Sequence, residues 1–105
     1  MRKPRSGSIQ KVNRKWEAII SPTALREIDK LPLDIARDIL DKIEWLCNEV
    51  EIIKHSRLKG GEEFSLHSGQ YRILYILDRL QHQIDILDIG KHDEVYKRLR
   101  KRQHT

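Results

Sequence analysis

Two neighbouring apolar runs, residues 71–78 and 83–92, constrain the fold of this chain more than any other feature. The first is rich in Ile, Leu and Tyr and the second in Ile and Leu, a composition typical of β-strands, and the polar residues between them favour a turn. In the first run, alternation places Tyr71 and Ile73 on one face and Arg72 and Leu74 on the other. Both faces are largely apolar, as in a central strand of a sheet, and Arg72 is the exception that requires a reason.

The rest of the chain supplies two more strands and two helices. Residues 16–20 alternate as a short strand, and Ser21 followed by Pro22 is typical of a helix start. Apolar residues then recur at helical spacing in residues 24–31 and 36–50, on either side of Pro32. Residues 63–67 alternate strictly, and the turn at residues 68–70 favours a hairpin.

This order predicts an α+β fold. We expect a small twisted, mainly antiparallel four-stranded sheet packed against an N-terminal α-helical hairpin, in the order β-α-α-β-β-β, with a short C-terminal tail or helix. The 105 residues suffice for one domain with a modest core. Cys47 falls on an apolar helical face, so we expect a small buried side chain rather than a nucleophile.

Basic residues are concentrated at the two ends. Residues 1–15 hold six Lys and Arg and residues 97–105 hold five, with no acidic residue in either segment. We therefore expect a flexible basic arm at 1–15, a single domain at 16–99 and a basic tail at 100–105. Basic ends of this kind favour a phosphate-rich partner such as nucleic acid, or else serve only solubility.

Several classes of protein are not indicated. The chain has no apolar run of membrane-spanning length and no apolar segment of a secretory signal after its basic start, so we expect a cytoplasmic protein with no membrane partner. The five histidines and single cysteine are too dispersed for a zinc pattern, and phosphate-loop and dinucleotide fingerprints are lacking. We expect no metal and no small-molecule cofactor.

Four segments together resemble the RelE/ParE superfamily of toxins from type II toxin–antitoxin pairs, over residues 16–99. They are the helical hairpin, Arg-Leu-Lys-Gly at 57–60, Ser-Gly-Gln-Tyr-Arg-Ile-Leu-Tyr at 68–75, and Ile-Gly-Lys-His-Asp-Glu-Val-Tyr at 89–96. For RelE-like members the resemblance implies a metal-independent, ribosome-dependent endoribonuclease. Such a toxin cuts mRNA in the 70S A site by attack of a ribose 2′-hydroxyl on the adjacent phosphate, and a cognate antitoxin protein neutralises it.

The same resemblance implies candidate catalytic residues. Arg72 matches an arginine that contacts the scissile phosphate. Alternatively, Arg72 forms an ion pair with a nearby Asp or Glu on the sheet. Tyr96 matches a C-terminal tyrosine that stacks on a base or orients the reacting groups, or it only packs the tail. His92 stands where many RelE members have arginine and is similar to the YafQ branch, in which histidines supply acid–base catalysis. His67 on the neighbouring strand is expected either in the same groove or facing solvent.

Candidate RNA-binding residues lie in the basic loop and beside the last motif: His55, Arg57, Lys59 and Lys91. Glu63 and Ser65 stand approximately where the best-known RelE toxin has lysines. That departure leaves two alternatives open: a ParE-like toxin that inhibits DNA gyrase without nuclease activity, and an inactive antitoxin-binding module. The nuclease hypothesis further requires Arg72 and His92 to face the same side of the sheet.

Overall fold

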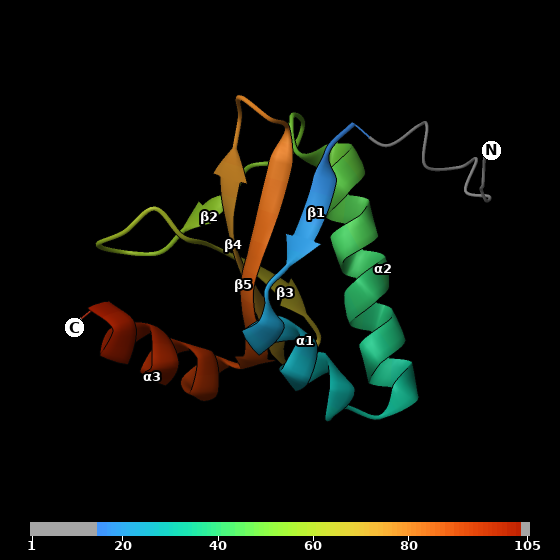
Figure 1. Ribbon diagram of the computed structural model, residues 1–105, viewed down its shortest axis with the longest axis vertical. Coiled ribbons are helices and arrows are strands. Elements are labelled where there is room, and N and C mark those ends of the chain that lie inside the picture. Colours follow the sequence, from blue (N-terminus) through green and yellow to red (C-terminus); the bar gives the residue numbers. More distant parts are fainter. Residues whose placement is uncertain (1–14, 104–105) are drawn as a thin grey trace.

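The computed structural model describes residues 15–103, and the predicted arm therefore lies outside the described residues except for Lys15. Eight elements follow in order: β1 (Glu17–Ile20), α1 (Pro22–Asp29), α2 (Leu33–Glu49), β2 (Ser56–Arg57), β3 (Phe64–Ser68), β4 (Tyr71–Asp78), β5 (Gln83–Lys91) and α3 (His92–Gln103). In Figure 1, α2 stands beside the sheet, and α3 extends from the other side of its lower end. The α+β prediction is confirmed.

The strands form one sheet in the order β1-β5-β4-β3-β2. β1 runs parallel to β5, and the other neighbours are antiparallel, so β4 is central as its two apolar faces indicated. All four predicted strands are present. The count of four is nevertheless wrong, because Ser56–Arg57 adds a fifth strand that pairs with Phe64 and Ser65. Two residues are too few to show an alternating pattern, and this segment was expected to be a loop.

The helical hairpin covers one face of the sheet and forms the main core with Ile73, Tyr75, Ile84, Ile86 and Ile89. The predicted cap is present: the Ser21 hydroxyl accepts a hydrogen bond from the backbone N–H of Ala24, and it donates one to the backbone of Leu87. Cys47 is buried, as expected. Leu25 and Leu40, which were predicted on the apolar stripes, are instead about half exposed because they lie at the margins of the stripes.

The opposite face of the sheet is partly covered by α3, through a second cluster of Leu74, Val95 and Leu99. The tail at the end of the domain is thus a helix that reaches Gln103, and residues 100–103 belong to it rather than to a separate basic tail. Acidic residues in its first turn and basic residues in its last turn interact favourably with the helix dipole and stabilise the helix. Glu94 also accepts a hydrogen bond from the Lys91 backbone N–H, half of a capping box.

None of the helices within residues 15–103 is both long and apolar enough to cross a membrane.

Candidate functional site

The face of the sheet that carries α3 also carries Arg72 and His67. Arg72 alternates with Ile73, which faces the hairpin core, and therefore lies on the same face as Leu74, which packs against α3. In the antiparallel register, His67 of β3 is directly opposite Arg72. Side chains opposite one another in such a pair share a face at close range, so the structure brings Arg72 and His67 together. Arg72 is half-buried and His67 is exposed.

His92 and Tyr96 come to this face from the first turns of α3. Their rings meet edge to face, with the centroids 4.3 Å apart. The Tyr96 hydroxyl donates a hydrogen bond of 3.3 Å to the hydroxyl of Ser65, which is opposite Leu74 in the β3–β4 register. Arg72 and His92 therefore lie on the same side of the sheet, as the nuclease hypothesis requires.

The orientation of the His92 ring is set by its neighbour on the helix. Nδ1 of His92 lies 3.0 Å from a carboxylate oxygen of Asp93. Because a carboxylate accepts hydrogen bonds, this contact favours a proton on Nδ1 and leaves Nε2 to exchange a proton with a substrate. Just over half of the His92 side chain is exposed, so a substrate can reach it.

A buried ion pair fixes α3 against β5. Asp88 is fully buried, and its carboxylate accepts hydrogen bonds of 2.8 Å from Nε and 3.1 Å from Nη2 of Arg98. The hydrogen bond to Asp88 raises the pKa of Arg98. Nη1 of Arg102 lies 3.9 Å from the same carboxylate. The sequence interpretation missed this pair, although a carboxylate between apolar residues of a strand, as in Leu87-Asp88-Ile89, is a signal that a buried partner is needed.

Gly90 permits the close approach of α3 to the sheet. A Cβ atom at this position would lie 2.9 Å from Nη2 of Arg98 and 3.1 Å from a methyl group of Val95. Such distances are too short for a side chain to fit without displacing its neighbours. The glycine of the last motif therefore has a packing role, which places His92 and Tyr96 over the sheet.

Of the four candidate RNA-binding residues, Lys59 lies on the α3 side of the sheet. It is exposed and lines a cavity together with Tyr96. Arg57 is also exposed, but it is opposite Phe64 in the β2–β3 register, and its guanidinium lies 5.0 Å from the Phe64 ring centroid. Phe64 packs against the hairpin core, so Arg57 belongs to the hairpin side.

His55 is also held on the hairpin side. Its Nε2 donates a hydrogen bond of 2.8 Å to the carbonyl oxygen of Val50, and its Nδ1 lies 2.5 Å from the hydroxyl of Tyr75. Tyr75 belongs to the main core, and burial raises its pKa to about 12. Both ring nitrogens of His55 are thus engaged by the protein, and the structure does not bring this residue to Arg72.

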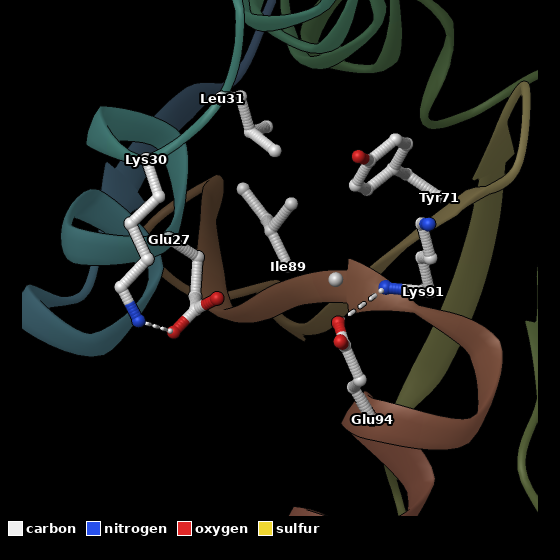
Figure 2. A pocket seen from close by; sticks show the side chains of 8 residues that line it. Glu27, Lys30, Leu31, Tyr71, Ile89, Lys91 and Glu94 are labelled. Carbon is white, nitrogen blue, oxygen red and sulfur yellow. Dashed lines mark hydrogen bonds and ion pairs between the residues drawn. The ribbon is translucent and has the colours of Figure 1, made fainter.

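The side chain of Lys91, like that of His55, lies on the hairpin side of the sheet. It is opposite Tyr71 in the β4–β5 register, whereas Arg72 is opposite Gly90. Figure 2 shows Lys91 beside Tyr71 on one side of β5 and the Glu94 side chain on the other. Residues of α1 and β5 line a cavity of about 180 Å³ there. Alternation along β5 therefore separates Lys91 from the surface that carries Arg72.

We use the term "α3-side surface" for Arg72, His67, His92 and Tyr96. It combines a permanent cation, two titratable imidazoles and a phenol, which is sufficient to bind a phosphate and move a proton. Within residues 15–103, no group of three or more His, Cys, Asp or Glu side chains is placed to hold a metal ion.

Comparison with known proteins gives one family match. The model of a family described as "ParE toxin of type II toxin-antitoxin system, parDE" matches residues 18–96. A comparison with curated protein sequences gave no match.

Solved structures of similar fold include toxins named both RelE and ParE. The toxin–antitoxin complex RelBE2 from Mycobacterium tuberculosis has a chain with 26% identity and a TM-score of 0.64, covering 74% of this chain and 99% of that one. A mutant of Escherichia coli RelE in the free state gives 24% identity, a TM-score of 0.67, and coverage of 84% and 97%. A chain of the chromosomal ParDE system of Pseudomonas aeruginosa has 12% identity and a TM-score of 0.62, covering 75% of this chain and 97% of that one.

Proposed function

The chain belongs to the ParE toxin family of type II toxin–antitoxin systems, within the RelE/ParE superfamily, and from this premise we propose that it is a ribosome-dependent endoribonuclease. Its proposed substrate is mRNA in the ribosomal A site, and its proposed place of action is the cytoplasm. The observation that carries the proposal is the placement of Arg72, His67, His92 and Tyr96 on one side of the sheet.

Each of these side chains has a role in the proposed reaction. A ribose 2′-oxygen attacks the adjacent phosphorus, the bond from phosphorus to the 5′-oxygen breaks, and a 2′,3′-cyclic phosphate and a 5′-hydroxyl remain. The 2′-hydroxyl loses a proton and the leaving 5′-oxygen gains one. Nε2 of His92 accepts the first proton or supplies the second, since Nδ1 is engaged by Asp93. Arg72 stabilises the charge that develops on the phosphate oxygens. His67 supplies a second titratable group beside Arg72, and Tyr96 orients a base or the reacting groups.

The proposed protein partner is a cognate antitoxin. The M. tuberculosis relative was solved as a toxin–antitoxin complex, and family membership makes such a partner the natural inhibitor. We expect a segment of this antitoxin to cover the helices or the sheet of the toxin.

Inhibition of DNA gyrase is the second candidate function. It is favoured by Glu63 and Ser65, which stand where the best-known RelE toxin has lysines, and by the ParE family match. Ser65 is buried and bonded to Tyr96, so in this protein the position supports the tyrosine rather than presenting a cation.

Mapping of mRNA 5′ ends after induction in cells separates the two functions. The nuclease proposal expects codon-phased cuts that disappear in Arg72→Ala and His92→Ala. Arg37→Ala is the matched control, because Arg37 is exposed on α2, away from the α3-side surface. Growth arrest with intact messages and damaged DNA would instead establish gyrase inhibition, and the absence of any phenotype would indicate an inactive antitoxin-binding module.

A further inference from the structure

Part of the sheet face on the α3 side is not covered by the helix. α3 packs against this face through Val95 and Leu99, near the end of β5 where Gly90 lies. Figure 1 shows α3 extending from this lower end of the sheet, whereas the turn between β4 and β5 lies at the upper end. The upper parts of β1, β5 and β4 therefore present side chains that α3 does not bury.

Two rows of these side chains cross the three strands. In one row Asp85 of β5 lies between Ile19 of β1 and Ile76 of β4. In the next row, toward the upper end, Gln83 lies between Glu17 and Asp78. The residues that alternate with them in each strand pack into the main core on the opposite face: Ala18, Ile20, Leu77, Ile84 and Ile86. All members of the two rows thus lie on the α3 side.

The two rows combine negative charge with exposed apolar surface. Ile19 is 48% exposed, although isoleucine is usually buried. The Asp85 carboxylate accepts a hydrogen bond of 3.1 Å from the neutral amide of Gln83. Within residues 15–103, none of the three carboxylates has an ion-pair partner. We call this area the "acidic patch": Glu17, Ile19, Ile76, Asp78 and Asp85.

The outer side of α3 carries the opposite charge. Arg98 and Arg102 are directed to the buried Asp88 carboxylate, at the inner side of the helix. Three further cations, Lys97, Arg100 and Lys101, are exposed, and in the part of the chain that the structure describes no ion pair involves them. We call these three residues the "basic band".

We propose that two copies of this chain associate through the α3 side of the sheet, with the basic band of each copy on the acidic patch of the other. Within one copy the two areas are held apart, because the Asp88–Arg98 pair and the Leu99 contacts fix α3 at the lower end of the sheet. Since both areas lie on the same side of the molecule, a twofold axis satisfies both contacts at once.

The dimensions of the two areas agree. The 12 residues of α3 form a helix about 18 Å long, and three strands spaced about 4.8 Å apart present a face about 14 Å wide. A helix from the second copy can therefore cross all three strands, place its cations beside the three carboxylates and cover Ile19 and Ile76. Exposed charge pairs contribute little singly and are screened by salt, so we expect a weak, salt-sensitive dimer.

Sedimentation equilibrium of the full chain, from about 1 µM to about 1 mM, tests the association. We expect a reversible equilibrium between monomer and dimer. The dimer should weaken when the salt concentration rises from about 0.05 M to about 0.5 M, because the Debye length then falls well below 10 Å.

Charge reversals assign the contact to the two areas. Asp85→Lys and Arg100→Glu should each raise the dissociation constant of the dimer about tenfold or more, because the twofold axis repeats each loss. Asp41→Lys and Arg37→Glu make the same changes of charge at exposed positions of α2, on the hairpin side, and should leave the constant near that of the parent. Glu17→Lys, at the exposed first residue of β1, replaces Asp85→Lys if thermal unfolding shows that variant to be unfolded.

An equal mixture of the Asp85→Lys and Arg100→Glu proteins is the sharpest test. In a mixed dimer, one contact joins an unaltered basic band to an unaltered acidic patch, and the other joins two areas that have both been reversed. The mixture should therefore associate more strongly than either variant alone.

Four results would overturn the inference: a monomer at all concentrations, a dimer that salt does not weaken, equal losses with the α2 controls, or no gain of association on mixing. A monomer would mean that the acidic patch is free or serves a different basic protein. The inference is independent of the proposed nuclease function, which the His92-dependent cuts test separately.

Discussion

The carboxylate of Asp88 and the guanidinium of Arg98 join the middle of β5 to α3 through two hydrogen bonds, with the carboxylate wholly removed from solvent. The helix that carries His92 and Tyr96 is also held by a small apolar cluster and by the hydrogen bond from Tyr96 to Ser65. The position of the candidate catalytic groups therefore depends on an ion pair that takes no part in the proposed chemistry.

Arg98→Gln should lower the free energy of unfolding by about 3 kcal/mol. It removes both Arg98 hydrogen bonds from the buried Asp88 carboxylate and leaves the Arg102 guanidinium 3.9 Å away. The lower end of the usual ~3–5 kcal/mol applies because Arg102 remains and because a third of the Arg98 side chain is exposed. Urea denaturation measures the change. Lys97→Gln, at the adjacent exposed position, is the control and should be nearly neutral; equal effects of the two substitutions would contradict a specific role for the pair.

Gly90→Ala should destabilise the protein by about 1–3 kcal/mol, because the new methyl group meets Arg98 and Val95 at distances that require α3 to move. The shift of the thermal midpoint reports this cost. In a Val95→Ala background, where the obstructing methyl group of Val95 is gone, the same substitution should cost less. Strict additivity of the two changes would show that crowding against Val95 is not the cause.

The stability of the protein should fall between pH 10 and about pH 12 through Tyr75. Its pKa is about 12 in the folded protein and near 10 in the unfolded chain, so unfolding releases a proton in this range. The contribution of the Tyr75 hydroxyl to the free energy of unfolding is fully present below pH 10. It is lost as the pH rises toward 12, at up to about 1.4 kcal/mol per pH unit.

Urea unfolding at about pH 9 and about pH 11.5 tests this pH dependence. Tyr75→Phe should flatten it, whereas Tyr71→Phe, at a partly exposed position four residues earlier on the same strand, should retain the slope of the parent protein. Identical slopes for all three proteins would mean that the hydroxyl of Tyr75 does not titrate differently on folding.

Arg72→Ala should reduce cleavage of ribosome-bound mRNA by about 10²–10³-fold, the usual effect of losing one donor to a developing oxyanion. Its effect on unfolding should stay near 1 kcal/mol or less, because Arg72 has no ion-pair partner within residues 15–103. Single-turnover cleavage and thermal unfolding are measured on the same preparation. A variant that is unfolded would assign Arg72 a structural role instead.

His92→Arg should keep a cation beside Tyr96 but remove the imidazole, which can both accept and donate a proton. If His92 exchanges the proton, cleavage should fall by about 10²–10⁴-fold and the pH dependence of the rate should change. A pH–rate profile of the parent and the variant decides this. An unchanged profile would move the acid–base role to His67, the other histidine on the α3-side surface.

The main elements could be predicted because each leaves a local pattern. Alternation in residues 71–78 correctly assigned the two faces of β4, and with them the side on which Arg72 lies. β2 could not be predicted, since its two residues become a strand only by pairing with β3. The same holds for the Asp88–Arg98 pair, which depends on how α3 packs.

The candidate RNA-binding residues show the same limit. Spacing along the chain placed His55, Arg57 and Lys59 in one basic segment, but the fold divides them: His55 bonds to Tyr75 in the core, and Lys59 lines a cavity with Tyr96 on the α3 side. Lys91 is next to His92 in sequence, yet it points to the other face because it alternates with Gly90, which is opposite Arg72. The division of the basic segment depends on the pairing of β2 with β3, which no local pattern reveals.

The parallel pairing of β1 with β5 determines how early the protein can fold during its own synthesis. Ser21, at the end of β1, is bonded to Leu87, 66 positions later in the chain. A ribosome adds about 5–20 residues per second, so several seconds pass between the synthesis of β1 and that of β5. Until then the emerging chain has neither a completed sheet edge nor the helix that follows β5. The folded domain thus appears only after β5 and α3 have been synthesised, and the ribosome that makes the chain is not exposed to a folded toxin before then.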